Sequence, residues 1–214
     1  MKRFPSDIAF TPAVKAIQTE KGSRPAYARV EQTRGWATRI TPELEAFLGE
    51  LDMFYLATSN GDGQPYVQYR GGPPGCLQVT SAETLAFADY GGNQQYITLG
   101  NLAENAQAFI FLIDYVNRRR IKLWGTARVI EGDGTLIERL HEPAYPARLE
   151  RVIEFTVAAW DVNCPQHIHR RYPDSVVIRL KQRIAELEAE LATRGEEKSV
   201  SPAVRNRPGP RQSL

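Results

Sequence analysis

The feature that most constrains the fold is an alternating run at residues 119–130. Apolar side chains recur with a spacing of two, at Ile121, Leu123, Ala127 and Val129, and polar or amphipathic side chains lie between them. Successive side chains of a β-strand point to opposite faces, so this spacing is typical of a strand with one buried face. The run therefore predicts a long strand.

Shorter runs predict further strands. Residues 108–113 are continuously apolar, as in a strand that is buried on both faces. Asn60 and Gly61 begin a strong hairpin turn at residues 60–63, because Asn and Gly accept positive φ. Short strands separated by turn residues indicate an antiparallel barrel rather than a parallel sheet. About six strands are expected, drawn from residues 53–59, 64–70, 76–80, 84–89, 108–113, 119–130 and 152–160.

Helices are expected to flank the strands. Thr41 can cap a helix that begins at Pro42, and its apolar residues at positions 44, 47, 48 and 51 share one face. Residues 11–18 predict one or two further helical turns, again with a capping Thr followed by Pro. The helix that begins at Pro42 is expected to close one end of the barrel, and the helix at 11–18 belongs to an N-terminal arm.

A heptad stripe marks the C-terminal region. Its apolar residues are spaced by three and four positions, and they are Val177, Leu180, Ile184, Leu187 and Leu191. Two heptads are too short to be stable alone, so the helix is expected to pack on the body or on its copy in a second subunit. The predicted division is an arm at 1–39, a barrel domain at 40–172, a helix at 173–194 and a disordered tail at 195–214, which is rich in Pro, Ser and Arg.

Composition excludes several classes of protein. The formal net charge of the 214 residues is +2, so nothing in the charge suggests binding to nucleic acid or to a membrane surface. No run is long enough for a transmembrane helix, and the N-terminus lacks the apolar core of a signal peptide. With only two cysteines, a reducing cytoplasm is the expected compartment.

A polar segment between two strands, residues 90–105, is the first candidate site. Gly91 and Gly92 permit a sharp turn, and a short helix is expected near Gln95, whose free N–H groups would form an anion site. Arg70 ends a strand before a glycine pair, where it could hold a phosphate or simply lie at the surface. Asn93 could bind a ligand or merely cap the helix.

These segments together resemble the pyridoxamine 5′-phosphate oxidase-like family of FMN-binding split barrels. The matching motifs are GQPY at 63–66, the GN…NL…N helix at 92–105, the apolar strand after it, and RRxKxWGxA at 119–127. The resemblance covers roughly residues 40–170. It implies a mainly β, Greek-key-like antiparallel split barrel with flanking helices, FMN as cofactor, and a homodimer whose groove holds the flavin ring.

The resemblance also implies the cofactor-binding residues. Gln68 stands where the family usually has a phosphate-binding arginine, with Arg70 as its replacement, and Thr98 stands where the family has a lysine. Arg119 and Arg120 match the strand that reaches the partner's flavin. With the residues of the 160–171 cluster added, the full set of predicted cofactor-binding residues is Gln68, Tyr69, Arg70, Gly71, Asp89, Asn93, Tyr96, Thr98, Asn101, Arg119, Arg120, Trp160, Asn163, Cys164 and His167.

Residues 160–171 concentrate chemically active side chains. Cys164, His167 and His169 could ligate a metal, but their spacing matches no common zinc pattern, and no metal site is expected. Cys164 could also be an axial haem ligand. The preferred interpretation is a loop that faces the flavin, with Trp160 near the ring and His167 as a donor and weak catalytic candidate, against a purely structural loop.

The expected function is an FMN-dependent oxidoreductase that acts on a small molecule. The flavin would carry the hydride chemistry, and the protein would bind and orient it. The C-terminal Arg-and-His motif that holds the substrate phosphate of true pyridoxamine-phosphate oxidases is not evident, so vitamin B6 oxidation is not implied. The alternatives are a non-enzymatic haem- or flavin-binding carrier or sensor, and a dimeric interaction module with an empty groove.

Overall fold

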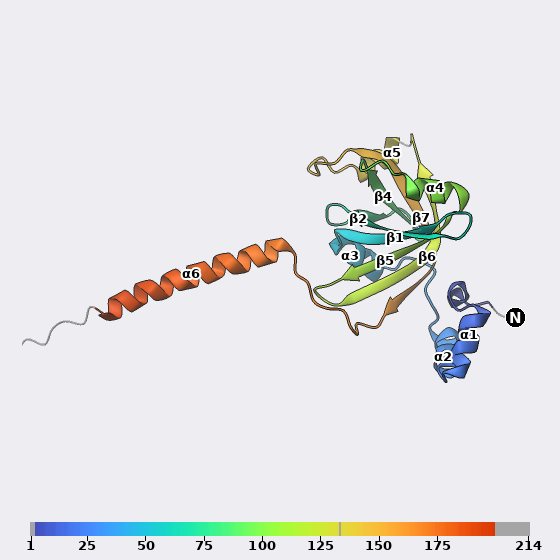
Figure 1. Cartoon of the computed structure of the whole chain (residues 1–214), viewed down its shortest axis with the longest axis horizontal. Helices are drawn as coiled ribbons and strands as arrows, with labels where there is room; N and C mark the ends of the chain where they lie inside the picture. The colour runs from blue at the N-terminus through green and yellow to red at the C-terminus, as the bar shows by residue number, and fades with distance from the viewer. Residues whose placement is uncertain (1–2, 133, 200–214) are drawn as a thin grey trace, which may run out of the picture. The chain divides into compact units, whose positions relative to one another are not determined.

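The computed structural model describes residues 3–132 and 134–199. The chain forms two compact units, one that ends at Arg170 and one that begins at Arg171. The first unit contains an N-terminal helical arm and one β-sheet (Figure 1). The second contains a single long helix, α6 (Asp174–Ser199).

The sheet has seven strands, and every neighbouring pair is antiparallel. Their order is β2-β1-β5-β6-β7-β4-β3. The strands are β1 (Met53–Ser59), β2 (Pro65–Gly71), β3 (Leu77–Val79), β4 (Thr84–Tyr90), β5 (Gln107–Asp114), β6 (Arg119–Ile130) and β7 (Leu149–Asn163).

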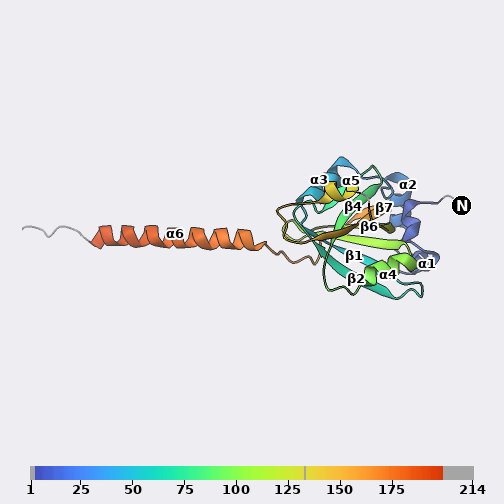
Figure 2. The same ribbon diagram turned by 90° about the horizontal axis from the view of Figure 1, so that it is seen from above.

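Side chains close the sheet into a split barrel. β2 and β4 are separated by four strands in the sheet order, yet Arg70 of β2 forms an ion pair with Asp89 of β4. The rings of Phe54 on β1 and Phe87 on β4 also meet, with their centres 4.9 Å apart. The sheet must therefore curl to bring its two ends together, as the second view also indicates (Figure 2). The predicted antiparallel split barrel with flanking helices is confirmed.

The core fills the concave side of this sheet. Alternate residues of β1, β5 and β6 point inward and are almost fully buried. The expectation that residues 108–113 are buried on both faces is wrong, because only one face of the curled sheet encloses the core. Ile110 and Leu112 point into the core, whereas Phe109 and Phe111 are half-buried on the outer face.

Short helices flank the sheet. In α3 (Pro42–Glu50), the Thr41 hydroxyl accepts a hydrogen bond from the Leu44 N–H at 3.3 Å, so the predicted cap is confirmed. The buried face of α3 includes Leu44, Phe47 and Leu48, as predicted, and packs near β3. The other helices of the first unit are η1 (Pro5–Ile8), α1 (Pro12–Glu20), α2 (Arg24–Thr33), α4 (Ile97–Glu104) and α5 (Gly134–Leu140).

The N-terminal arm docks on the outside of the sheet. Thr11 caps α1 as predicted, but residues 24–33 form a second helix, α2, that the pattern did not indicate. After α2, Trp36 stacks on Trp124 of β6 with ring centres 4.6 Å apart. The arm is therefore fixed to the barrel by aromatic stacking.

Gly125 allows β6 and β7 to approach closely. The pairing register shifts between Trp124 and Gly125, which marks a bulge. A Cβ atom at this position would lie 1.9 Å from the carbonyl oxygen of Thr156. Only glycine fits this position without moving the backbone.

In the second unit, α6 continues to Ser199, beyond the predicted helix end at residue 194. Residues 195–199 of the predicted disordered tail therefore belong to this helix, and its residues 200–214 lie outside the described residues. None of the described helices is long and apolar enough to cross a membrane.

Candidate functional site

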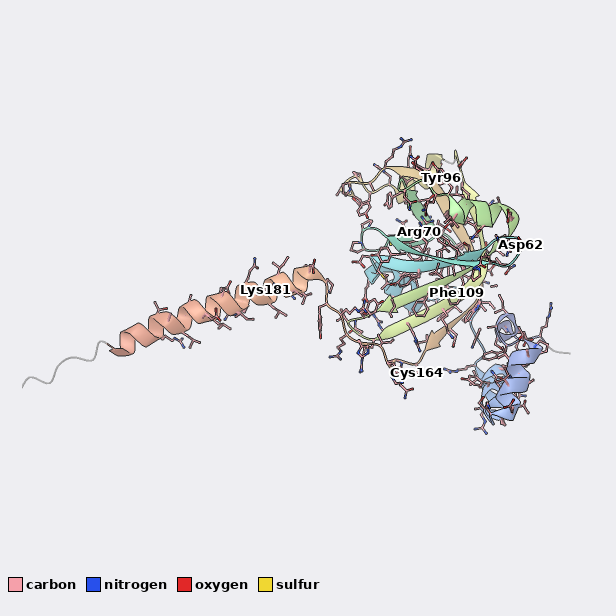
Figure 3. The ribbon with its side chains drawn as sticks, in the orientation of Figure 1. Asp62, Arg70, Tyr96, Phe109, Cys164 and Lys181 are labelled. Carbon is pink, nitrogen blue, oxygen red and sulfur yellow. The ribbon has the colours of Figure 1, made fainter. Side chains whose placement is uncertain are left out.

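A pocket lies where β2, β4, β7 and the start of α4 meet. Its volume is about 200 Å³. Arg70 and Tyr96, two of its lining residues, are labelled in Figure 3. The lining residues are Tyr66, Gln68, Arg70, Asp89, Tyr90, Gly92, Asn93, Gln94, Gln95, Tyr96, Ile97, Thr98, Leu99, Glu150 and Arg151.

Two arginines converge on one carboxylate in this pocket. Asp89 is 5% exposed and pairs with Arg70 and, at 3.0 Å, with Arg151. Arg151 also pairs with the neighbouring Glu150 at 3.0 Å. Two guanidinium groups facing two carboxylates leave the pocket close to neutral. An anion held here would therefore depend on directed hydrogen bonds more than on excess positive charge.

Each of these arginines has one buried donor without a hydrogen bond in the described part of the chain. The buried Nε of Arg70 has no hydrogen-bond partner among the residues that the structure describes. Nε of Arg151 also lacks a hydrogen bond, although Glu131, whose side chain is 71% exposed, lies 3.4 Å from it. Buried polar groups usually have a partner, so an unpaired donor at a pocket indicates a place for a ligand.

The charges around Arg151 keep it ionised. Burial acts to lower the pKa of Arg151, but the hydrogen bond to Asp89 and the negative charges of Asp89, Glu150 and Glu131 outweigh it and raise the pKa above its ordinary value. Arg151 therefore presents a permanent positive charge at the pocket.

The first turn of α4 supplies backbone donors on the other side of the pocket. Its N-terminal residue, Tyr96, has a φ of 53°, in the left-handed region, and no side chain caps the helix. Uncapped N–H groups at a helix start attract anions. The preceding Gln94 is also left-handed, with a φ of 59°. Left-handed non-glycine residues cluster at ligand sites, where the surrounding fold holds them in place.

β2 and α4 are joined at the pocket by a direct hydrogen bond. The Thr98 hydroxyl donates to Oε1 of Gln68 at 2.8 Å. Asn93 accepts a hydrogen bond from the N–H of Gln95 at 3.2 Å, which shapes the turn before the helix. Gln68 and Thr98, the two positions at which the resemblance predicted a departure from the family's usual residues, therefore pair with each other.

The predicted site residues fall into two groups. Six of them line the pocket, namely Gln68, Arg70, Asp89, Asn93, Tyr96 and Thr98. Tyr69 lies between Gln68 and Arg70 on β2 but packs its ring against Tyr55, on the opposite face of the sheet, and Gly71 ends the same strand. Asn101 is buried on α4, where it donates to the Thr58 hydroxyl at 2.9 Å.

The other predicted residues lie outside the pocket. Arg119 pairs with Asp114 at 3.0 Å and with Glu50 at 2.9 Å. Trp160 donates its indole N–H to the carbonyl oxygen of Arg39 at 2.8 Å. Arg120 is opposite Asn163 in the β6–β7 ladder, and the side chain of Asn163 lies outside the described residues.

Cys164 and His167 follow β7 and are exposed. Figure 3 shows Cys164 at the far end of the barrel from Arg70 and Tyr96. His167 has a φ of 63°, so the loop bends sharply there. Within the described ranges, no group of three His, Cys, Asp or Glu side chains could hold a metal ion.

The other nine pocket residues were not among the predicted site residues, and three of them, Arg151, Glu150 and Tyr66, show why. Arg151 was placed just before a strand that was expected to begin at residue 152, but β7 begins at Leu149 and pairs Arg151 with Asp89. Glu150 enters the pocket for the same reason. Tyr66 alternates with Gln68 and Arg70 on one face of β2, and this spacing of two could have identified it.

The sequence model of the pyridoxamine 5′-phosphate oxidase family matches residues 40–181 of this chain. No curated protein matches the sequence. The family assignment rests on the family model.

Three solved structures share part of the fold at low sequence identity. An FMN-binding protein from Syntrophomonas wolfei is 11% identical over 68% of this chain and 97% of its own, with a TM-score of 0.48. HupZ from Group A Streptococcus is 17% identical over 62% of this chain and 99% of its own, with a TM-score of 0.44. HutZ, the haem storage protein from Vibrio cholerae, is 18% identical over 58% and 94%, with a TM-score of 0.39.

Proposed function

Because this chain belongs to the pyridoxamine 5′-phosphate oxidase family, we propose that it binds FMN and acts as an FMN-dependent oxidoreductase on a small molecule. The observation that carries the proposal is the pocket of β2, β4, β7 and α4, in which a buried guanidinium retains an unpaired N–H. The residues present fit a phosphate. Arg70 and Arg151 would hold it, together with the backbone N–H groups at the start of α4.

The bound flavin would supply hydride transfer, and the protein would position it. Arg70 and Arg151 are themselves fixed by Asp89, so their donors are oriented before a ligand arrives. Such preorganisation reduces the entropy lost on binding. No histidine is among the residues that line the pocket. His167 therefore stays the catalytic candidate of the proposal, at the flavin ring rather than at the phosphate.

We further propose that FMN binding requires a homodimer. A pocket of about 200 Å³ is small for a whole cofactor, since ligand sites commonly span roughly 300–1,000 Å³. The flavin ring would then lie outside it and need a second surface. Aromatic and apolar side chains on the outer face of β1, β2 and β5 provide one, and they are Tyr55, Val67, Tyr69, Phe109 and Phe111.

In this dimer, the loop after β7 would contact the partner's flavin. The support is that Cys164 and His167 are exposed and follow directly from the last strand of the sheet. Arg119, Arg120, Trp160 and Asn163 belong to the same end of β6 and β7. The free thiols of Cys76 and Cys164 support the proposal of a reducing, cytoplasmic compartment.

An absorption spectrum of freshly purified protein tests the cofactor. Flavin bands, or their recovery when the protein is reconstituted with FMN, support the proposal. A Soret band would favour the haem-carrier alternative instead, and a protein that takes up neither group would refute both. Light scattering should give about twice the chain mass of 24.1 kDa, and a monomer that retains FMN would refute the dimer.

A further inference from the structure

The second unit carries an apolar stripe that α6 itself leaves uncovered. The five heptad residues of α6 are all exposed, from 37% for Val177 to 67% for Leu191. They occupy alternating a and d positions, which place them along one seam of the helix. The stripe therefore has the geometry of one strand of a coiled coil.

Charge is divided between the two halves of the heptad segment of this helix, residues 177–191. The first half of the segment contains three basic residues, Arg179, Lys181 and Arg183, and the second half contains three acidic ones, Glu186, Glu188 and Glu190. This order opposes the helix dipole, which favours acidic residues near the N-terminus.

The order of charges along α6 also places like charges four residues apart, Arg179 with Arg183 and Glu186 with Glu190. Such pairs destabilise an isolated helix. Within α6, Arg183 relieves this only at the boundary, where it pairs with Glu186 at 2.9 Å and lies 3.8 Å from Glu190.

We propose that α6 pairs with α6 of a second copy of this chain in an antiparallel two-stranded coiled coil. The pairing is centred between residues 185 and 186. Ile184 then lies opposite Leu187 of the other copy, and Leu180 lies opposite Leu191. Each apolar layer joins an a residue to a d residue, as antiparallel helices require when their seams face each other.

The charges select this orientation. Antiparallel pairing places Arg183 beside Glu190 of the other copy, both at g positions, and Lys181 beside Glu188, both at e positions. By two-fold symmetry each pair occurs twice. Parallel pairing would instead bring the two basic halves together and the two acidic halves together, and would keep only the attraction between Arg183 and Glu188 across the seam. The like charges that destabilise a single helix thus become complementary in the antiparallel pair.

Distances between spin labels on the full-length chain test the orientation. Ser175 and Ala189 occupy the same outward heptad position, so each is replaced by Cys in a Cys164→Ser background. Cys76 reacts slowly, because burial raises the pKa of its thiol to about 11. At 1.5 Å per residue, antiparallel pairing offsets the two labels along the axis by about 32 Å at residue 175 and about 11 Å at residue 189. Similar distances at both positions would show parallel pairing. If no distance between labels on two copies can be detected, α6 packs elsewhere. Either result overturns the proposal.

Charge exchange tests the same contact through side chains. Arg183→Glu should abolish the short distance measured at residue 189, because it faces Glu190 with a second negative charge. Adding Glu190→Arg should restore that distance, whereas adding Glu188→Arg should not. Arg179→Glu makes the same change at an outward position and should leave the distance intact. Rescue by Glu188→Arg alone would refute the antiparallel register. Neither test uses FMN, so the outcome is separate from that of the proposed function.

Discussion

Replacing Arg70 by Ala tests the pocket directly. The Arg70 side chain is only 12% exposed, and its Nε is buried without a partner. If this group donates to the FMN phosphate, its removal deletes a charged hydrogen bond worth about 1.5–3 kcal/mol. Because about 1.4 kcal/mol corresponds to a factor of ten, FMN should bind roughly 10- to 150-fold more weakly.

The same change should lower stability only modestly. Removing one partner of a buried ion pair commonly destabilises a protein by about 3–5 kcal/mol, since the other charge is left unpaired. Here Asp89 keeps Arg151 at 3.0 Å. The free energy of unfolding of Arg70→Ala should therefore fall by about 1–2 kcal/mol, below the range for an unpaired carboxylate.

Quenching of flavin fluorescence during titration gives the FMN affinity, and urea denaturation of the apoprotein gives the stability. Arg128→Ala is the matched control, because Arg128 is 72% exposed, lies on β6 away from the pocket lining, and pairs with Glu154. The control should change neither quantity by more than a few tenths of a kcal/mol. Unchanged FMN affinity in folded Arg70→Ala protein would remove Arg70 from the site and refute the argument from its unpaired Nε.

Three further changes test other parts of the structure. Gly125→Ala should lower the free energy of unfolding by about 1–3 kcal/mol or more, whereas Gly100→Ala, which meets open space, should not; equal urea midpoints would contradict the bulge. Burial raises the pKa of the Cys76 thiol from 9.0 to about 11, so the folded chain keeps this proton after the unfolded chain has lost it. The free energy of unfolding should therefore fall as pH rises from about 9 to 11. Cys76→Ser should reduce that slope, and parallel stability-versus-pH curves for the two proteins would refute the argument. His167→Ala should lower the reduction potential of bound FMN while the fold stays intact, because a histidine beside the reduced flavin stabilises its negative charge; a change in melting temperature alone would favour a structural loop.

Local signals allowed much of the fold to be predicted. The Thr41 cap and the turn at residues 60–63 depend on neighbours in sequence, and the structure contains both. In the turn, Oδ1 of Asn60 accepts a hydrogen bond from the N–H of Gln64, and Gly63 has a φ of 84°. Each signal acts within a few residues, so tertiary packing has little scope to override it.

Features that depend on distant parts of the chain were not predictable. Arg151 reaches the pocket only because β7 pairs with β4 in one particular register. The docking of Trp36 on Trp124 joins the arm to a strand far along the chain. The alternation of buried and half-buried residues in β5 depends on the outer face of the sheet staying uncovered, which an apolar run cannot indicate. Of the predicted residues of β6 and the loop after β7, His167 is tested by the substitution above, and Arg119, Arg120 and Cys164 stay predictions.

The closure of the barrel has a mechanical consequence. β2 is hydrogen-bonded to β1 on one edge only, and its junction with β4 contains an ion pair in place of a strand ladder. Separating these two strands would therefore break side-chain contacts but no backbone hydrogen bond between them. An anion bound by Arg70 and Arg151 would hold the junction shut. Because β2 is then held at the junction as well as by β1, its amide protons should exchange with solvent more slowly once the pocket is filled, while those of β5 and β6 keep their rates.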